Sequence, residues 1–159
     1  MKIFAILVLS LVLFACGFTL RQAPHFSFTT LYYPTSGSGL DQKLKRAIES
    51  GGQVRVLIAP EPRAQVTFQT LDVRREESAV SLTAQGQVRE LVLRVRLKFK
   101  LQNAQGVELI PETELLIERN VSYSETAALS KEVEKTTLYN DMENDVVQQI
   151  MRRLAAVRL

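Results

Sequence analysis

The segment Leu91–Leu101 reads LVLRVRLKFKL, and its pattern decides the class of fold. Its odd positions are all apolar, whereas its even positions from Arg94 onward are all cations. Alternation at a period of two is typical of a strand that packs one face against a core. The cations are therefore expected to form a row about 20 Å long on the opposite face. This basic row consists of Arg94, Arg96, Lys98 and Lys100.

A second alternating segment, residues 109–123, follows a hairpin turn that the sequence NAQG predicts at 103–106. The two strands should pair antiparallel, so that their polar faces coincide. Arg94, Arg96 and Lys98 are then expected to meet Glu112, Glu114 or residues beside them in ion pairs that fix the register. An uncovered face of this kind can also bind phosphates, for which the fork of an Arg side chain is well shaped. Both explanations of the row stay open at this point.

The rest of the chain predicts helices on both sides of the strand region. Ser38 and Asp41 resemble a capping box, which begins a helix that Gly51-Gly52 ends. A stripe of apolar residues predicts a second helix of about 30 residues, from Ser124 or Thr126 to the end of the chain. The polar run RREES at 74–78 predicts a turn or hairpin tip. Further strands are expected at 28–33, 54–58, 64–73 and 79–84, with a bulge or edge near Leu71. Within the second alternating segment, the strand pattern runs over 113–123.

This order of elements predicts an α+β fold. We expect a two-layer sandwich, with two helices on one face of a mostly antiparallel mixed sheet of about four strands. The chain of 159 residues is long enough for one ordinary domain.

The chain begins with MKIFAILVLSLVLFAC, a single Lys followed by an apolar run that ends at its only cysteine. The run has the layout of a secretory signal, and the residues LFAC resemble the bacterial lipobox. Residues 1–15 are therefore expected to be a lipoprotein signal peptide, and Cys16 the lipid attachment site. Residues 16–27 are then a lipidated tether, and residues 28–159 a single domain. Gly17 follows the cysteine in place of the Asp that signals inner-membrane retention, which implies the outer membrane, facing the periplasm.

Residue types that carry catalysis are scarce. The single histidine, His25, lies in the expected tether, so no Ser-His-Asp or Cys-His arrangement can form in the domain. Metal-ligand spacings and nucleotide-binding glycine motifs are absent from the sequence, and we expect no metal and no cofactor. Glu112 and Glu114 could serve as an acid/base pair, but cross-strand ion pairs explain them more simply. We therefore expect a protein that is not an enzyme, and no nucleic-acid partner, because the basic row lacks stacking aromatics.

Both ends of the mature chain resemble the LptE (RlpB) family of lipopolysaccharide (LPS)-assembly lipoproteins. The segment CGFTLR at 16–21 is similar to the start of the mature family proteins. The segment ALSKEVEKTTLYNDMENDVVQQIMRRL at 128–154 is similar to their C-terminal helix. The resemblance implies a non-enzymatic partner of the LptD β-barrel that plugs the barrel lumen and binds LPS during delivery to the outer leaflet. It also implies that Lys131, in ALSK, lies where the family places a base that contacts the ligand.

Two functions are compatible with these observations. The first is an outer-membrane lipoprotein that assembles with LptD and binds LPS through the basic row and Lys131. The alternative is a generic periplasm-facing envelope lipoprotein that binds another protein or a small anionic ligand.

Overall fold

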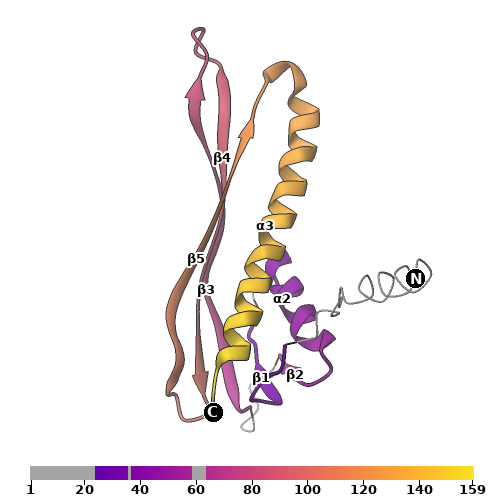
Figure 1. Ribbon diagram of the computed structural model, residues 1–159, viewed down its shortest axis with the longest axis vertical. Helices are drawn as coiled ribbons and strands as arrows, with labels where there is room; N and C mark the ends of the chain where they lie inside the picture. Colours follow the sequence, from indigo (N-terminus) through magenta and orange to yellow (C-terminus); the bar gives the residue numbers. More distant parts are fainter. Residues whose placement is uncertain (1–23, 36, 59–63) are drawn as a thin grey trace, which may run out of the picture.

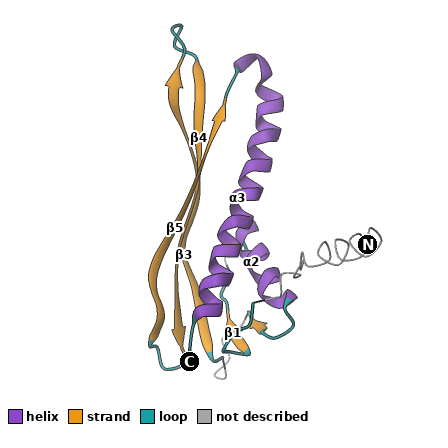
Figure 2. Ribbon diagram, viewed as in Figure 1, coloured by secondary structure: helices purple, strands orange, loops and turns teal. Residues whose placement is uncertain are grey.

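The computed structural model describes residues 24–35, 37–58 and 64–159, and it has two layers, with helices on one face of a sheet (Figures 1 and 2). The sheet has five strands in the order β2-β1-β3-β4-β5, with β1 parallel to both β2 and β3 and the remaining pairs antiparallel. The α+β prediction is confirmed, with one strand more than expected. In chain order the elements are β1 Thr30–Tyr32, α2 Gly39–Ser50, β2 Arg55–Leu57, β3 Val66–Leu82, β4 Val88–Asn103, β5 Glu108–Ser122, the 3-10 turn η1 Glu125–Ala127 and α3 Ala128–Ala156.

The three long strands and α3 extend well beyond the three short elements, so the molecule has two ends of different construction (Figure 1). We call one end the base. It holds β1, β2, α2, residues 141–156 of α3 and the strand segments beside them. We call the other end the arm; it comprises residues 73–95, 117–127 and 128–140. The tip of the β3–β4 hairpin and the start of α3 both lie in the arm (Figure 1).

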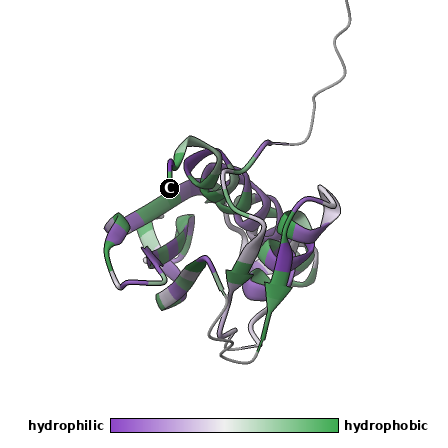
Figure 3. Cartoon of the chain, turned by 90° about the horizontal axis from the view of Figure 1, so that it is seen from below, coloured by the Kyte–Doolittle hydropathy of each residue, from purple (hydrophilic) through white to green (hydrophobic). Residues whose placement is uncertain are grey.

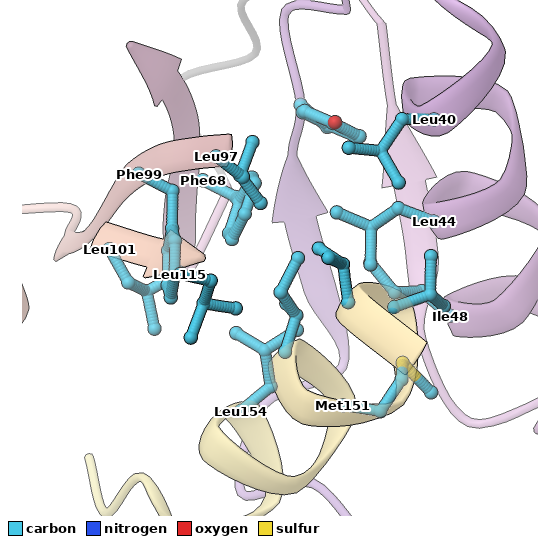
Figure 4. Packing of buried hydrophobic residues seen from close by; sticks show 14 of the residues in the cluster. Leu40, Leu44, Ile48, Phe68, Leu97, Phe99, Leu101, Leu115, Met151 and Leu154 are labelled. Atoms are coloured by element: carbon cyan, nitrogen blue, oxygen red, sulfur yellow. The ribbon is translucent and has the colours of Figure 1, made fainter. Parts of the chain in front are cut away.

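The core of the base is apolar and aromatic (Figure 4). The rings of Phe68 and Phe99 stack with centroids 5.2 Å apart, and Tyr33 meets Phe68 edge-on at 5.1 Å. The strands supply this core from one face only, because hydrophobic and hydrophilic residues alternate along them, as the colours of Figure 3 show. Figure 4 labels the core side chains Leu40, Leu44 and Ile48 of α2, Met151 and Leu154 of α3, and Phe68, Leu97, Phe99, Leu101 and Leu115 of the sheet.

The first residues described also belong to this packing. Phe26 is buried and stacks with Phe28 at 5.4 Å. The hydroxyl of Ser27 donates a hydrogen bond to the carbonyl of Val157 at 2.9 Å, which ties this segment to the C-terminal end of α3.

The start of α2 combines a cap with a buried polar contact. The Ser38 hydroxyl accepts a hydrogen bond from the backbone N–H of Asp41 at 3.1 Å, as the capping box predicts. The Asp41 side chain is almost fully buried and accepts a hydrogen bond from the Tyr33 hydroxyl at 2.5 Å. Burial, and secondly this hydrogen bond, raise the pKa of Tyr33 well above its ordinary value.

The prediction of a turn at RREES was wrong. Residues 74–78 lie inside β3, which runs without a break from Val66 to Leu82 and has a bulge between Thr70 and Asp72. Arg74 pairs with Asp72 of the same strand, but the other three charged side chains of the run have partners that the local sequence does not reveal. Arg75, for example, reaches Glu143 on α3, and Glu76 pairs with Arg96 on β4. These charges are therefore paired with residues distant in the chain, whereas in a hairpin tip they would be hydrated.

Charged contacts join α3 to β3 in the arm. Lys135 is bound by Glu77 of β3 at 2.8 Å and by Glu132 of its own helix at 2.7 Å. Hydrogen bonds to Glu132 and then to Glu77 raise the pKa of Lys135 above its ordinary value. The Tyr139 hydroxyl donates to the backbone carbonyl of Glu76 at 2.7 Å.

Where the arm joins the base, Glu143 lies buried between two cations. Its carboxylate meets Lys43 of α2 at 2.9 Å and Arg75 of β3 at 2.5 Å. The Arg75 guanidinium also lies 5.2 Å from the centre of the Tyr139 ring. One carboxylate therefore connects three elements at this junction.

No helix among the described residues is long and apolar enough to cross a membrane.

Candidate ligand-binding face

The basic row lies on the face of the sheet opposite the helices. On β4 the odd residues from Leu91 to Leu101 are buried, whereas Arg94, Arg96, Lys98 and Lys100 are half-buried on the other face. Both helices cover the buried face, so neither covers the row (Figure 1). The strand geometry that the sequence predicted is therefore confirmed, and the row faces away from the core.

Three of the four cations pair with carboxylates on the neighbouring strands. Arg94 binds Glu118 at 2.5 Å. Arg96 binds Glu114 and lies 3.6 Å from Glu76, and Lys98 lies 3.6 Å from the same Glu114. The predicted cross-strand ion pairs are thus present, and they use acids on both sides of β4.

Glu112 takes no part in these pairs, contrary to the first of the two expected contacts. A register shift separates the pairs Phe99↔Thr113 and Leu101↔Ile110, so Pro111 and Glu112 form a bulge. Lys100, which lies across from this bulge and opposite Gln69 of β3, makes no ion pair or side-chain hydrogen bond with any described residue. The end of the row nearer the base therefore carries a cation that no carboxylate of the described residues neutralises.

Lys131 lies apart from the row. It belongs to the first turn of α3, where its ammonium pairs with Glu134 at 2.7 Å and donates to the Ser122 hydroxyl at 3.2 Å. Ser122 pairs with Glu90, four residues along β4 from Arg94. The predicted contacts therefore form a row and a separate cation at the arm end of β5, rather than one cluster.

A groove at the base, which was not predicted from the sequence, also brings cations beside apolar residues. The groove has a volume of about 480 Å³ and lies between the first residues of β5 and the C-terminal end of α3. Within the described ranges, neither Arg153 nor Arg158 has an ion pair. The clustering of Arg residues near the chain end is a signal in the sequence, but cations there also complement the helix dipole. The lining residues are Leu109, Ile110, Pro111, Thr113, Arg153, Ala156, Val157 and Arg158.

The remaining predictions concern the lipid attachment site, a metal site and the single histidine. Cys16 lies outside the described residues, which begin at Pro24. In the part of the chain that is described, no group of His, Cys, Asp and Glu is arranged to hold a metal ion. His25 is exposed, and its Nδ1 lies 3.1 Å from Oε1 of Gln53.

Comparison with known proteins points to one family. A family model described as "LptE: Lipopolysaccharide-assembly" matches residues 25–154. Among solved structures, the chain is similar to an uncharacterized lipoprotein B from Nitrosomonas europaea, with 30% identity, a TM-score of 0.74, and coverage of 88% of this chain and 91% of that one. None of the curated protein sequences searched matches this chain.

Two more distant structures share the fold. The rare lipoprotein B from Shewanella oneidensis is 19% identical, with a TM-score of 0.68 and coverage of 80% of this chain and 95% of that one. A minor lipoprotein from Acinetobacter baumannii is 20% identical, with a TM-score of 0.61 and coverage of 83% and 92%. The family match spans most of the chain, and the more similar structure covers nearly all of the described fold. This chain therefore belongs to the LptE family of lipopolysaccharide-assembly lipoproteins.

Proposed function

We propose that this protein is an outer-membrane lipoprotein that assembles with the LptD β-barrel, occupies its lumen, and binds LPS during transport to the outer leaflet. The observation that carries the proposal is the family match over residues 25–154. The protein acts as a binding partner in this proposal, in keeping with a family that is not enzymatic.

The shape of the molecule is compatible with enclosure by a partner. The fold is elongated, and one face of its sheet has no helix over it (Figure 2). Three of the four cations of the basic row on that face are paired, so a partner with a polar inner surface that supplies an acceptor for Lys100 can surround the face without burying isolated charges.

Attachment to the membrane would come from Cys16. Acyl chains on this residue would anchor the protein stably, because each buried CH₂ contributes about 0.8 kcal/mol and one chain alone binds only reversibly. Cys16 lies a short tether away from Pro24, so the domain would stay close to the periplasmic side of the outer membrane. Replacing Cys16 by Ala should leave unprocessed precursor, and normal cleavage of that variant would contradict the anchor.

Among the proposed LPS contacts, Lys100 and Lys131 differ from the other three. Lys100 lacks a carboxylate partner among the described residues, so a phosphate can bind it without first displacing an ion pair. Lys131 keeps a pair with Glu134 at the surface, which is weak and easily exchanged. Arg94, Arg96 and Lys98 are held by Glu114 and Glu118, so we assign them secondary contacts with lipid A or core phosphates.

Copurification tests the LptD partnership. The full chain carrying an affinity tag, extracted from envelopes in mild detergent, should bring down a large β-barrel protein identified as LptD by mass spectrometry. A Cys16→Ala chain serves as the control for the contribution of the anchor. Recovery of the tagged chain without any barrel protein would contradict the proposed partnership.

Binding of purified LPS tests the ligand contacts. Lys100→Gln and Lys131→Gln should each weaken binding several-fold, since loss of one phosphate contact of about 1 kcal/mol corresponds to about fivefold. Arg152→Gln is the matched control, because it removes one exposed cation from a different surface. If the Lys100 and Lys131 variants bind LPS as well as Arg152→Gln does, neither lysine contacts LPS.

The groove between β5 and α3 favours the alternative function, binding of a small anionic ligand by an envelope lipoprotein. Its apolar floor and two arginines suit an amphiphile with an anionic head. Replacement of Arg153 and Arg158 by Gln tests this alternative. Loss of phosphatidylglycerol binding with unchanged LPS binding would support it.

A further inference from the structure

Strand β5 is an edge of the sheet along its whole length. It pairs only with β4, and no described strand pairs with its other side. Most of its residues are exposed, which agrees with an uncovered edge. An edge of this kind presents free N–H and C=O groups that can receive another strand.

The hydrogen-bond pattern identifies the residues that carry the free groups. The N–H of Tyr123 donates to the carbonyl of Arg89 at 2.8 Å, and these residues lie opposite each other in the register that pairs Ser122 with Glu90. In an antiparallel ladder the bonded pairs alternate, so the odd residues of β5 are bonded to β4. The even residues Glu114, Leu116, Glu118 and Asn120 consequently direct their N–H and C=O groups to the open edge.

The exposed part of β3 and the first part of β5 carry features that discourage added strands. The exposed part of β3 has a bulge at Leu71 and inward-facing charges at Arg75 and Glu77. The first part of β5 has the bulge at Pro111, where an N–H is also missing.

The remainder of β5, residues 113–122, lacks such features. It contains no Pro, Gly or Lys, and its register with β4 is regular from Thr113 to Ser122. Its one charged inner side chain, Arg119, is neutralised by Asp145 of α3 at 3.1 Å. This segment is therefore regular in register and open.

The charges on this segment select the kind of strand that can be added. Its outer face carries Glu114 and Glu118, whose side chains remain 35% and 49% exposed although they already pair with cations of β4. A second copy added antiparallel about Leu116 would place Glu114 of one copy opposite Glu118 of the other, which is repulsive. Centring the pair on Ile117 instead would place the apolar Leu116 opposite a carboxylate. A strand with basic residues at alternate positions avoids the repulsion between carboxylates. It places a cation opposite Leu116, as β4 does with Arg96, and β4 thus shows that this pattern suits the acids.

We propose that residues 113–122 of β5 form a docking edge for an extended segment of a partner protein in which basic residues alternate with apolar ones. The added strand would bond to the backbone of Glu114, Leu116 and Glu118 and place its cations beside the two carboxylates. This inference rests on the open edge and its charges, and it holds whether or not the partner is the LptD barrel.

A designed peptide tests the edge. The full chain, isotopically labelled and purified in detergent, is titrated with a short synthetic peptide in which Lys alternates with Val. The amide signals of Glu114, Leu116 and Glu118 should shift and become protected from hydrogen exchange. A peptide with Glu in place of Lys should leave them unchanged.

A proline variant separates the backbone contact from other effects. Leu116→Pro removes an N–H that points to the open edge and leaves the ladder to β4 intact, so peptide affinity should fall about tenfold or more. Leu116→Thr keeps the N–H and is the matched control. Its affinity should equal that of the unchanged chain, which also shows that loss of the Leu side chain is not the cause.

Three results would overturn the proposal. The first is equal binding of the acidic and basic peptides. The second is equal affinity of the Pro and Thr variants, with both folded by circular dichroism. The third is self-association through β5 without peptide binding, measured by analytical ultracentrifugation, because it would make a second copy the occupant. The outcome is independent of LPS binding and of LptD copurification, so failure here leaves the proposed function to its own tests.

Discussion

Both halves of β3 pair with β4, but they have very different roles. In the base, Val66 and Phe68 are fully buried in the apolar core. In the arm, the inward positions hold Arg75 and Glu77, which reach α3 through ion pairs. Because burial of an aromatic side chain contributes more than a partly exposed ion pair, stability should be concentrated in the base.

The largest expected effect is loss of an aromatic side chain from the base. Phe68→Ala removes a ring that contacts both Tyr33 and Phe99, and it should lower the free energy of unfolding by about 3–5 kcal/mol. Urea denaturation followed by circular dichroism measures the change. Leu82→Ala, at a position 58% exposed on the same strand in the arm, is the control and should change it by less than about 0.5 kcal/mol.

A smaller effect is expected at the junction of base and arm. Glu143→Ala leaves Lys43 and Arg75 without their shared carboxylate, which should cost about 2 kcal/mol. The loss stays below the cost of a fully buried broken pair, since both cations can gain water. A loss as large as that of Phe68→Ala would mean that charge, rather than apolar packing, organises the molecule.

Within the arm we expect a loss of about 1 kcal/mol. Lys135→Met keeps the length of the side chain but removes its pairs with Glu77 and Glu132. Since the folded-state pKa of Lys135 is raised, its contribution should be complete below about pH 10.5 and lost as the pH rises through the raised value. Hydrogen exchange should quicken for residues 128–140 and stay unchanged in the base. Uniform quickening would show that the two halves unfold as one unit.

The smallest effect is expected on the outer face. Glu114→Gln weakens the contacts of Arg96 and Lys98, and it should cost about 0.5 kcal/mol, because these side chains are about one-third exposed. The difference from the unchanged chain should shrink in high salt. A salt-independent loss above about 2 kcal/mol would show that the outer face contributes as the core does.

Sequence patterns were sufficient where the information is local. The alternation at 91–101 predicted β4 and its buried face, the pair Ser38 and Asp41 predicted the start of α2, and the apolar stripe predicted α3. The pattern failed at RREES because Arg75, Glu76 and Glu77 are paired with residues of α3 and β4, which are distant in the chain.

The candidate site residues can be divided in the same way, into those that a local pattern predicted and those that depend on contacts distant in the chain. The basic row could be read from one strand, and its pairing with Glu114 of β5 followed from a short hairpin. The pair between Arg94 and Glu118 and the exclusion of Glu112 were not predicted. The isolation of Lys100 could not be predicted, because it depends on the bulge at Pro111 and Glu112. The groove beside Arg153 and Arg158 joins the start of β5 to the end of α3, and no local pattern links these segments.

The sequence by itself determined the class of fold, the two faces of β4 and the family resemblance at both chain ends, because periodicity and short motifs are local properties. The tertiary structure alone decided which carboxylates pair with the row, that β3 is one uninterrupted strand, and that β5 presents an open edge. These properties depend on the order of strands in the sheet and on contacts between distant residues. Pairing across space, rather than the preference of any single segment, determines them.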